Sequence, residues 1–126
     1  MRESLFLIAL SLFVSGYAIS SRAQDLQVIK DSEAAQYVGK NVEVRGLVVA
    51  VYTSKKGNTF LNFGAKYPNQ TFTGSSRLGR SWRGTITLQG KVIGITGIVE
   101  MYQGKPEIKV LSMSQVKGAD SQPVAQ

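Results

Sequence analysis

The chain has 126 residues, with 15 lysines and arginines against 8 aspartates and glutamates, so its formal net charge is +7. This length fits one domain of common size and excludes a two-domain enzyme. The chain contains neither histidine nor cysteine. The usual ligands of zinc, copper and haem, the usual general base and the thiol nucleophile are therefore missing, and disulfide-stapled and metal-held folds are excluded with them.

The N-terminus has the pattern of an export signal. Arg2 follows the first methionine, residues 5–14 form an apolar run, and the small residues Ser21 and Ala23 precede a candidate cleavage site. An uncleaved membrane anchor is the alternative, but the apolar run is shorter than the ~18 residues that span a bilayer. We therefore expect a signal peptide at residues 1–23, cleavage after Ala23, no stable membrane insertion afterwards, and a periplasmic or secreted protein of bacterial type.

A short helix is predicted to open the mature domain. Residues 24–30 form a lead-in, and the domain itself is expected to cover residues 31–116. Asp31 or Ser32 is suited to cap a helix that ends at Gly39. Because this helix is barely two turns long, its Ala35 and Val38 edge must pack on another element.

Five strands are expected to follow. Residues 42–52 are rich in β-branched side chains, and a polar turn leads from them into a second strand at 59–63, which makes a hairpin. A third strand begins at 71–73, and residues 74–90 are expected to form a loop around one short apolar segment. The last two strands are predicted in order as residues 91–102 and 107–112, joined by a turn at 103–106. The tail, residues 117–126, is polar and expected to be disordered.

The first and fourth predicted strands share a local pattern. Each is entered through Gly-Lys and carries a second glycine in its interior, Gly46 in one and Gly97 in the other. A glycine inside a strand marks a bulge or sharp bend, which lets one long strand serve two sides of a small barrel. A tandem repeat is the alternative, but two copies are too few and the intervening sequence is not repeated.

Five strands with a short helix at one end suit a partly open Greek-key barrel. The sequences LNFG at residues 61–64, YPNQ at 67–70 and YQGKPEI at 102–108 resemble OB-fold nucleic-acid-binding domains of bacterial proteins, related to the anticodon-binding type. The resemblance covers about residues 33–116. It implies a mainly β fold, a five-stranded Greek-key OB-fold barrel, with a ligand groove over its first three strands and the loop after the third strand.

Candidate catalytic groups are scarce. Between Glu43 and Glu100 the sequence has no acidic residue, so the centre of the predicted barrel cannot supply the paired carboxylates that hold the metal of a nuclease. Without histidine the serines lack their usual base, and no Ser-Lys pair can be picked out from sequence. We therefore expect no enzyme activity, no catalytic residues, no metal site and no cofactor.

The same acid-free window interleaves basic residues with aromatic rings. Cations attract phosphates, and bases stack on rings, so this combination is typical of proteins that hold single-stranded nucleic acid. Strand alternation places Leu61 and Phe63 in the core and Phe60 and Asn62 on the outer groove, and Phe72 is expected in the core; for Tyr52 and Tyr67 a core position stays open. The predicted contacts are Lys55, Lys56, Lys66, Arg77, Arg80 and Arg83 to phosphate, Phe60, Tyr67 and Trp82 to bases by stacking, and Asn62 to a base edge by hydrogen bonding.

Simpler interpretations exist for two of these segments. Lys55 and Lys56 also suit a solvated hairpin tip. The segment from Arg77 to Arg83 could bind an acidic protein or lipid headgroups, although it lacks the apolar face for membrane insertion. We predict an exported nucleic-acid-binding protein for single-stranded DNA or RNA with low sequence specificity. The alternative is an exported OB module that binds a protein partner or an anionic envelope polymer through the same groove; export favours it, because chromosomal DNA and most RNA lie across the membrane.

Overall fold

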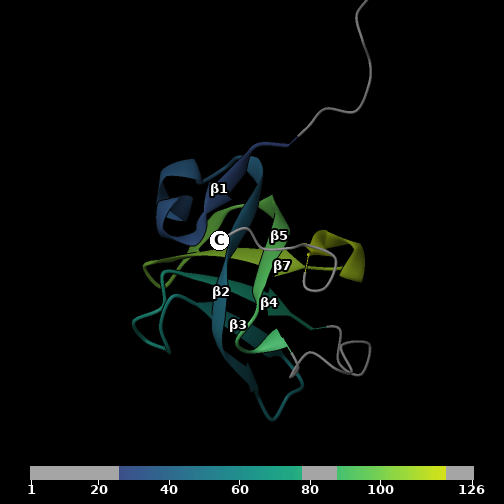
Figure 1. Ribbon diagram of the computed structural model, residues 1–126. Coiled ribbons are helices and arrows are strands. Elements are labelled where there is room, and N and C mark those ends of the chain that lie inside the picture. The colour runs from purple at the N-terminus through teal and green to yellow at the C-terminus, as the bar shows by residue number, and fades with distance from the viewer. Residues whose placement is uncertain (1–25, 78–87, 119–126) are drawn as a thin grey trace, which may run out of the picture.

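The computed structural model describes residues 26–77 and 88–118, and strands dominate this part of the chain (Figure 1). The predicted signal peptide, and with it the predicted export, lies outside the described residues. The strands are β1 (Val28–Lys30), β2 (Asn41–Thr53), β3 (Thr59–Phe63), β4 (Phe72–Ser76), β5 (Val92–Ile98), β6 (Glu100–Tyr102), β7 (Lys105–Val110) and β8 (Val116–Lys117). Short 3₁₀ helices occur at η3 (Asp31–Tyr37) and η6 (Met113–Gln115).

Strand β2 belongs to two sides of a curled sheet. Its residues 41–47 pair antiparallel with β5, and its residues 48–53 pair antiparallel with β3. The register shifts between Val48 and Ala50, and such a bulge increases the local bend and twist of a strand. The prediction that one long strand serves two sides of the barrel is confirmed, although the irregularity lies beside Val48 and not at Gly46.

The other pairings complete a Greek-key barrel. Strand β4 pairs antiparallel with β3 and parallel with β7, and β7 pairs antiparallel with β6. Because β5 leads into β6 through Val99, the strand that begins beside β2 ends beside β7. This is the strand order of an OB-fold, so the predicted mainly β, five-stranded OB-fold with a short N-terminal helix is confirmed.

Two short strands extend this barrel beyond the predicted five. Strand β1 lies parallel to β2 within the segment that was expected to be a lead-in, and the N-terminal segment packs at one end of the barrel (Figure 1). Strand β8 pairs with β5 and includes Lys117, which the sequence assigned to the tail. Within the described ranges, no helix is long and apolar enough to cross a membrane.

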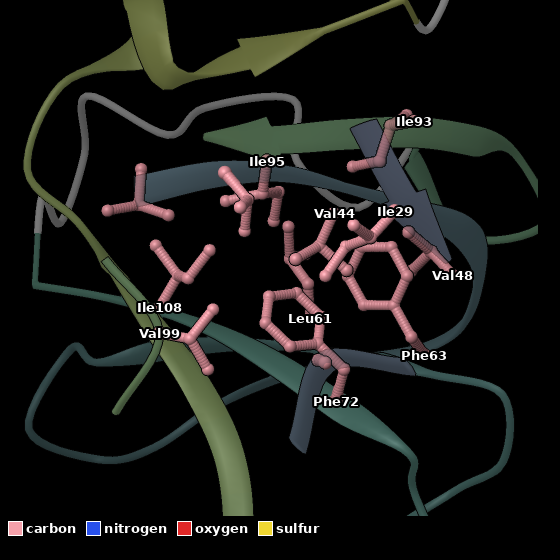
Figure 2. Close-up of a cluster of buried hydrophobic side chains, with 13 residues drawn as sticks. Ile29, Val44, Val48, Leu61, Phe63, Phe72, Ile93, Ile95, Val99 and Ile108 are labelled. Atoms are coloured by element: carbon pink, nitrogen blue, oxygen red, sulfur yellow. The ribbon is translucent and has the colours of Figure 1, made fainter. Parts of the chain in front are cut away.

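Apolar side chains fill the barrel interior (Figure 2). Leu61 and Phe63 of β3 and Phe72 of β4 are fully buried, as the strand alternation predicted. The rings of Phe63 and Phe72 meet edge to face with centroids 5.1 Å apart, a preferred aromatic geometry. Since successive residues of a strand point to opposite faces, this inward set turns Phe60 and Asn62 to the other face of β3.

The third strand runs further than the sequence predicted. A loop was expected from residue 74, yet β4 continues to Ser76 with partners on both sides. Gly74 fits there because a Cβ at this position would collide with Ile95 Cδ1 across the barrel. The Ser75 hydroxyl donates a hydrogen bond to Glu107 of β7. Small residues thus continue this strand instead of ending it.

The N-terminal helix is capped differently from the prediction. The Lys30 backbone N–H donates to Glu33 Oε1 at 2.9 Å, whereas the Asp31 carboxylate accepts a hydrogen bond from the Thr71 hydroxyl. Asp31 therefore ties the helix to the β3–β4 loop. The buried residue is Ala34, while Ala35 and Val38, expected to pack, are exposed. The reason is that the segment is a 3₁₀ helix with three residues per turn, which presents a different face to the barrel from an α-helix with 3.6 residues per turn.

The last predicted strands also change their bounds. The strand expected at 91–102 is divided at Val99, which bridges to Val38. The next strand begins at Lys105 because the turn needs only Gln103 and Gly104, both at positive φ. It ends at Val110, and Ser112, expected within it, instead caps helix η6.

Candidate functional site

A groove with a volume of about 690 Å³ lies over the outward face of β2 and β3. Tyr52 and Phe60, which are direct cross-strand partners in these two strands, form part of its wall. The β3–β4 loop closes one side with Tyr67, and the β6–β7 hairpin contributes Tyr102. Three separate segments of the barrel therefore meet at this groove.

The groove is lined with aromatic rings that are accessible to a ligand. Tyr52, Tyr67 and Tyr102 are 58%, 68% and 58% exposed, and these are the only exposed tyrosines among the described residues. Phe60 is half-buried, and its ring stacks on that of Tyr52 with centroids 6.2 Å apart and an interplanar angle of 18°. Exposed rings are costly to hydrate, and their concentration on one concave surface makes this groove the candidate binding site.

Buried polar side chains line the groove between these rings. Gln70 Nε2 donates to Thr73 Oγ1 at 3.2 Å, and Thr73 Oγ1 donates to Asn62 Oδ1 at 3.1 Å. Asn62, Gln70 and Thr73 are 5%, 6% and 7% exposed. Such a network fixes the orientation of its members and gives the groove a defined hydrogen-bonding surface.

Charge around the groove is mixed. Lys66 and Lys105 line it, and so does Glu107, which is 7% exposed and accepts the hydrogen bond from Ser75. Glu107 lies beyond the acid-free stretch of the sequence, and strand pairing brings it back beside β4. The groove itself is therefore more aromatic and less cationic than the sequence predicted.

The structure brings four of the predicted contact residues together in this groove. Phe60, Asn62, Lys66 and Tyr67 all line it. Lys55 and Lys56 are exposed at the tip of the β2–β3 hairpin, and they do not line it.

The remaining predicted contacts are not brought to the groove by the described part of the chain. Arg77 is exposed directly after β4 and does not line the groove. Arg80, Trp82 and Arg83 lie outside the described residues. Arg45, another basic residue of the acid-free window, pairs with Glu43 at 2.6 Å on the outer face of β2.

Several lining residues were not predicted as contacts from the sequence, although Gln70, Tyr102 and Lys105 lie in the sequences that carry the resemblance. Tyr102 and Lys105 flank the two-residue turn of the β6–β7 hairpin and are cross-strand partners, so a hairpin prediction with this register would have paired them. For Gln70 and Thr73 strand pairing gave no such signal, because their role depends on the position of the β3–β4 loop. Within the described ranges, no three acidic, histidine or cysteine side chains group into a metal site.

Comparisons with solved structures agree with the fold assignment. No family model matches the sequence, and neither does any curated protein. Among solved structures, asparaginyl-tRNA synthetase from Entamoeba histolytica superposes with a TM-score of 0.50 at 18% identity, over 81% of this chain and 25% of that one. Aspartyl-tRNA synthetase from the same organism gives a TM-score of 0.46 at 18% identity, over 87% of this chain and 27% of that one. This chain thus spans about a quarter of either synthetase, and the likeness to the first is one of fold.

Proposed function

We propose that this protein binds single-stranded nucleic acid, with little sequence preference, in the groove over β2 and β3. The observation that carries this proposal is the gathering of Tyr52, Tyr67, Tyr102 and Phe60 on one concave face of an OB barrel. Stacking of a base on an aromatic side chain contributes about 1 to 3 kcal/mol and tolerates any base. The fold neighbour with the TM-score of 0.50 is named for tRNA, which is compatible with a nucleic-acid ligand.

The arrangement of the rings favours a short single strand over a duplex. Tyr52 and Phe60 form one stacked platform, while Tyr67 and Tyr102 come from a loop and a hairpin on other sides of the groove. These are separate stacking positions, and bases reach them only when they are unpaired and splayed apart. A double helix keeps its bases stacked on one another and offers the groove only its backbone.

The distribution of charge indicates how the bound nucleic-acid strand is oriented in the groove. Glu107 is buried in the groove wall, and a carboxylate there repels phosphate. Lys66 and Lys105 attract it, and Lys55 and Lys56 continue the positive charge at the tip of the β2–β3 hairpin, just beyond the end of β2. The bases therefore point into the groove, and the phosphates follow the lysines.

We also propose that the protein is exported and acts outside the cytoplasm. The support is the N-terminal sequence: a positive start, an apolar run that is too short to span a bilayer, and small residues before Ala23. N-terminal sequencing of the protein recovered from the periplasm or medium of an expressing bacterium is expected to begin at Gln24. Recovery of the intact chain with the cytoplasmic fraction would overturn this part of the proposal.

A titration of the protein with short oligonucleotides tests the binding proposal. Trp82 is the only tryptophan, so its fluorescence reports on the segment that carries Arg80 and Arg83, while anisotropy of a labelled oligonucleotide reports binding itself. We expect binding at low salt that weakens as salt is added. If an anionic polysaccharide or polyphosphate binds equally well, and if alanine at Tyr67 changes neither affinity, the groove serves a polyanion or protein partner and the proposal is wrong.

A further inference from the structure

The hydrogen-bonded chain from Gln70 through Thr73 to Asn62 has two possible directions. As the structure has it, the amide of Gln70 donates to Thr73 and the Thr73 hydroxyl donates to Asn62 Oδ1. Gln70 Oε1 is buried and has no hydrogen-bond partner among the described residues. All three side chains line the groove, and Asn62 uses only its oxygen in these hydrogen bonds, which leaves its Nδ2 available to a ligand.

The opposite direction has the same number of hydrogen bonds. An amide group has an oxygen and a nitrogen of similar size, and a hydroxyl both donates and accepts. If both amides rotate by half a turn, Asn62 Nδ2 donates to Thr73, Thr73 donates to Gln70 Oε1, and Asn62 presents Oδ1 to the groove. Two hydrogen bonds remain and one Gln70 atom still lacks a partner. A ligand needs only a small difference in affinity to select either direction.

We propose that Thr73 and Gln70 are positioning residues that let Asn62 offer either a donor or an acceptor to a base in the groove. This inference rests on the proposed nucleic-acid function. At the 4-position of a pyrimidine or the 6-position of a purine, Nδ2 outward pairs with the keto oxygen of thymine, uracil or guanine, and Oδ1 outward accepts from the amine of cytosine or adenine. A fixed polar group that faces this position would be left unpaired against one of the two substituents. The reversible chain therefore explains how a buried polar wall coexists with low sequence preference.

Two substitutions at Gln70 lock the chain in opposite directions. In Gln70→Met the Thr73 hydroxyl keeps Asn62 Oδ1 as its only acceptor in the chain, so Nδ2 stays outward. In Gln70→Glu the carboxylate accepts a hydrogen bond from the Thr73 hydroxyl, so Asn62 Nδ2 donates to Thr73 Oγ1 and Oδ1 stays outward. The measured quantity is the ratio of dissociation constants for oligo(dT) and oligo(dC) of equal length with the full chain. The added charge of the glutamate cancels in this ratio, because both strands carry the same phosphates.

We expect the wild-type protein to bind oligo(dT) and oligo(dC) within about threefold. Gln70→Met should favour oligo(dT) by about tenfold and Gln70→Glu should favour oligo(dC) by about tenfold, the effect of one hydrogen bond lost in a desolvated site. Thr73→Ser keeps the hydroxyl and should leave the ratio at the wild-type value. Adding Asn62→Ala to Gln70→Met should bring the ratio back toward one, which a merely structural effect of Gln70 would not do.

Two outcomes would overturn the inference, and they are distinguishable. If the wild-type protein binds both oligonucleotides but Gln70→Met leaves their ratio unchanged, the reversible chain is wrong and the proposed function stands. If the wild-type protein binds neither, the proposed function fails and the inference fails with it. Gln70→Met is neutral and apolar, so it keeps the test decisive even if the buried glutamate of Gln70→Glu prevents folding.

Discussion

Replacing Tyr102 by alanine separates ligand binding from folding. Tyr102 lies at the end of edge strand β6, is 58% exposed, and makes no side-chain hydrogen bond to any described residue. Its loss should therefore change the free energy of unfolding by less than about 1 kcal/mol. If one base stacks on its ring, the variant loses about 1 to 3 kcal/mol of binding free energy, which raises the dissociation constant about 5- to 150-fold.

The assay compares ring-retaining and ring-deleting variants. Anisotropy of a labelled oligonucleotide gives the dissociation constant, and urea denaturation gives the stability of each variant. Tyr102→Phe should stay within about twofold of the wild type, whereas Tyr102→Leu should lose nearly as much affinity as alanine, because it is apolar without a stacking face. Leu111→Ala is the matched surface control, since Leu111 is 76% exposed and does not line the groove. Equal affinities for Tyr102→Ala and the wild type would refute the stacking argument.

Other substitutions test the charge pattern and the core. Lys66→Ala and Lys105→Ala should each make the slope of log affinity against log salt less negative by about 0.7. Lys40 is exposed but away from the groove, so Lys40→Ala should leave the slope unchanged. Equal slopes in all three variants would contradict the proposed phosphate path. Leu61→Ala removes a fully buried side chain and should cost about 2 to 5 kcal/mol in urea denaturation; a loss below 1 kcal/mol would contradict its core position. In Gly97→Ala the new Cβ would lie 2.5 Å from Ile108 Cγ2, so we expect a loss of about 1 to 3 kcal/mol by the same measurement, and wild-type stability would show that β5 and β7 are not so closely packed.

The barrel was predictable because its signals are local. β-branched runs, Gly-containing turns and the alternation of Leu61 and Phe63 with their neighbours identify strands and their inward faces without knowledge of tertiary contacts. The course of β4 through residues 74–76 was not predictable, because Gly74 and Ser75 have low strand propensity and are accepted only through Ile95 and Glu107 on other strands. Strand propensity is overridden by such packing.

The candidate site was only partly predictable, for a similar reason. Strand parity was enough to place Phe60 and Asn62 on the outer face of β3, and the interleaving of charge with rings identified Lys66 and Tyr67 in the loop that follows. Tyr102, Lys105 and Glu107 reach the groove only when β7 pairs with β4 and β6 folds back on it. Charge counted along the sequence therefore overestimated the cationic character of the groove, because it missed the acid that the Greek-key connection returns to it.

The most direct test of the account is the affinity of the protein for a short oligonucleotide at two salt concentrations that differ tenfold. If Lys55, Lys56, Lys66 and Lys105 each neutralise one phosphate, the slope of log affinity against log salt is about −2.8, so affinity should fall by roughly 600-fold while stacking keeps binding measurable at the lower salt. Absence of binding at the lower salt, or an affinity that does not change between the two, would contradict a groove that stacks bases and pairs its lysines with phosphates.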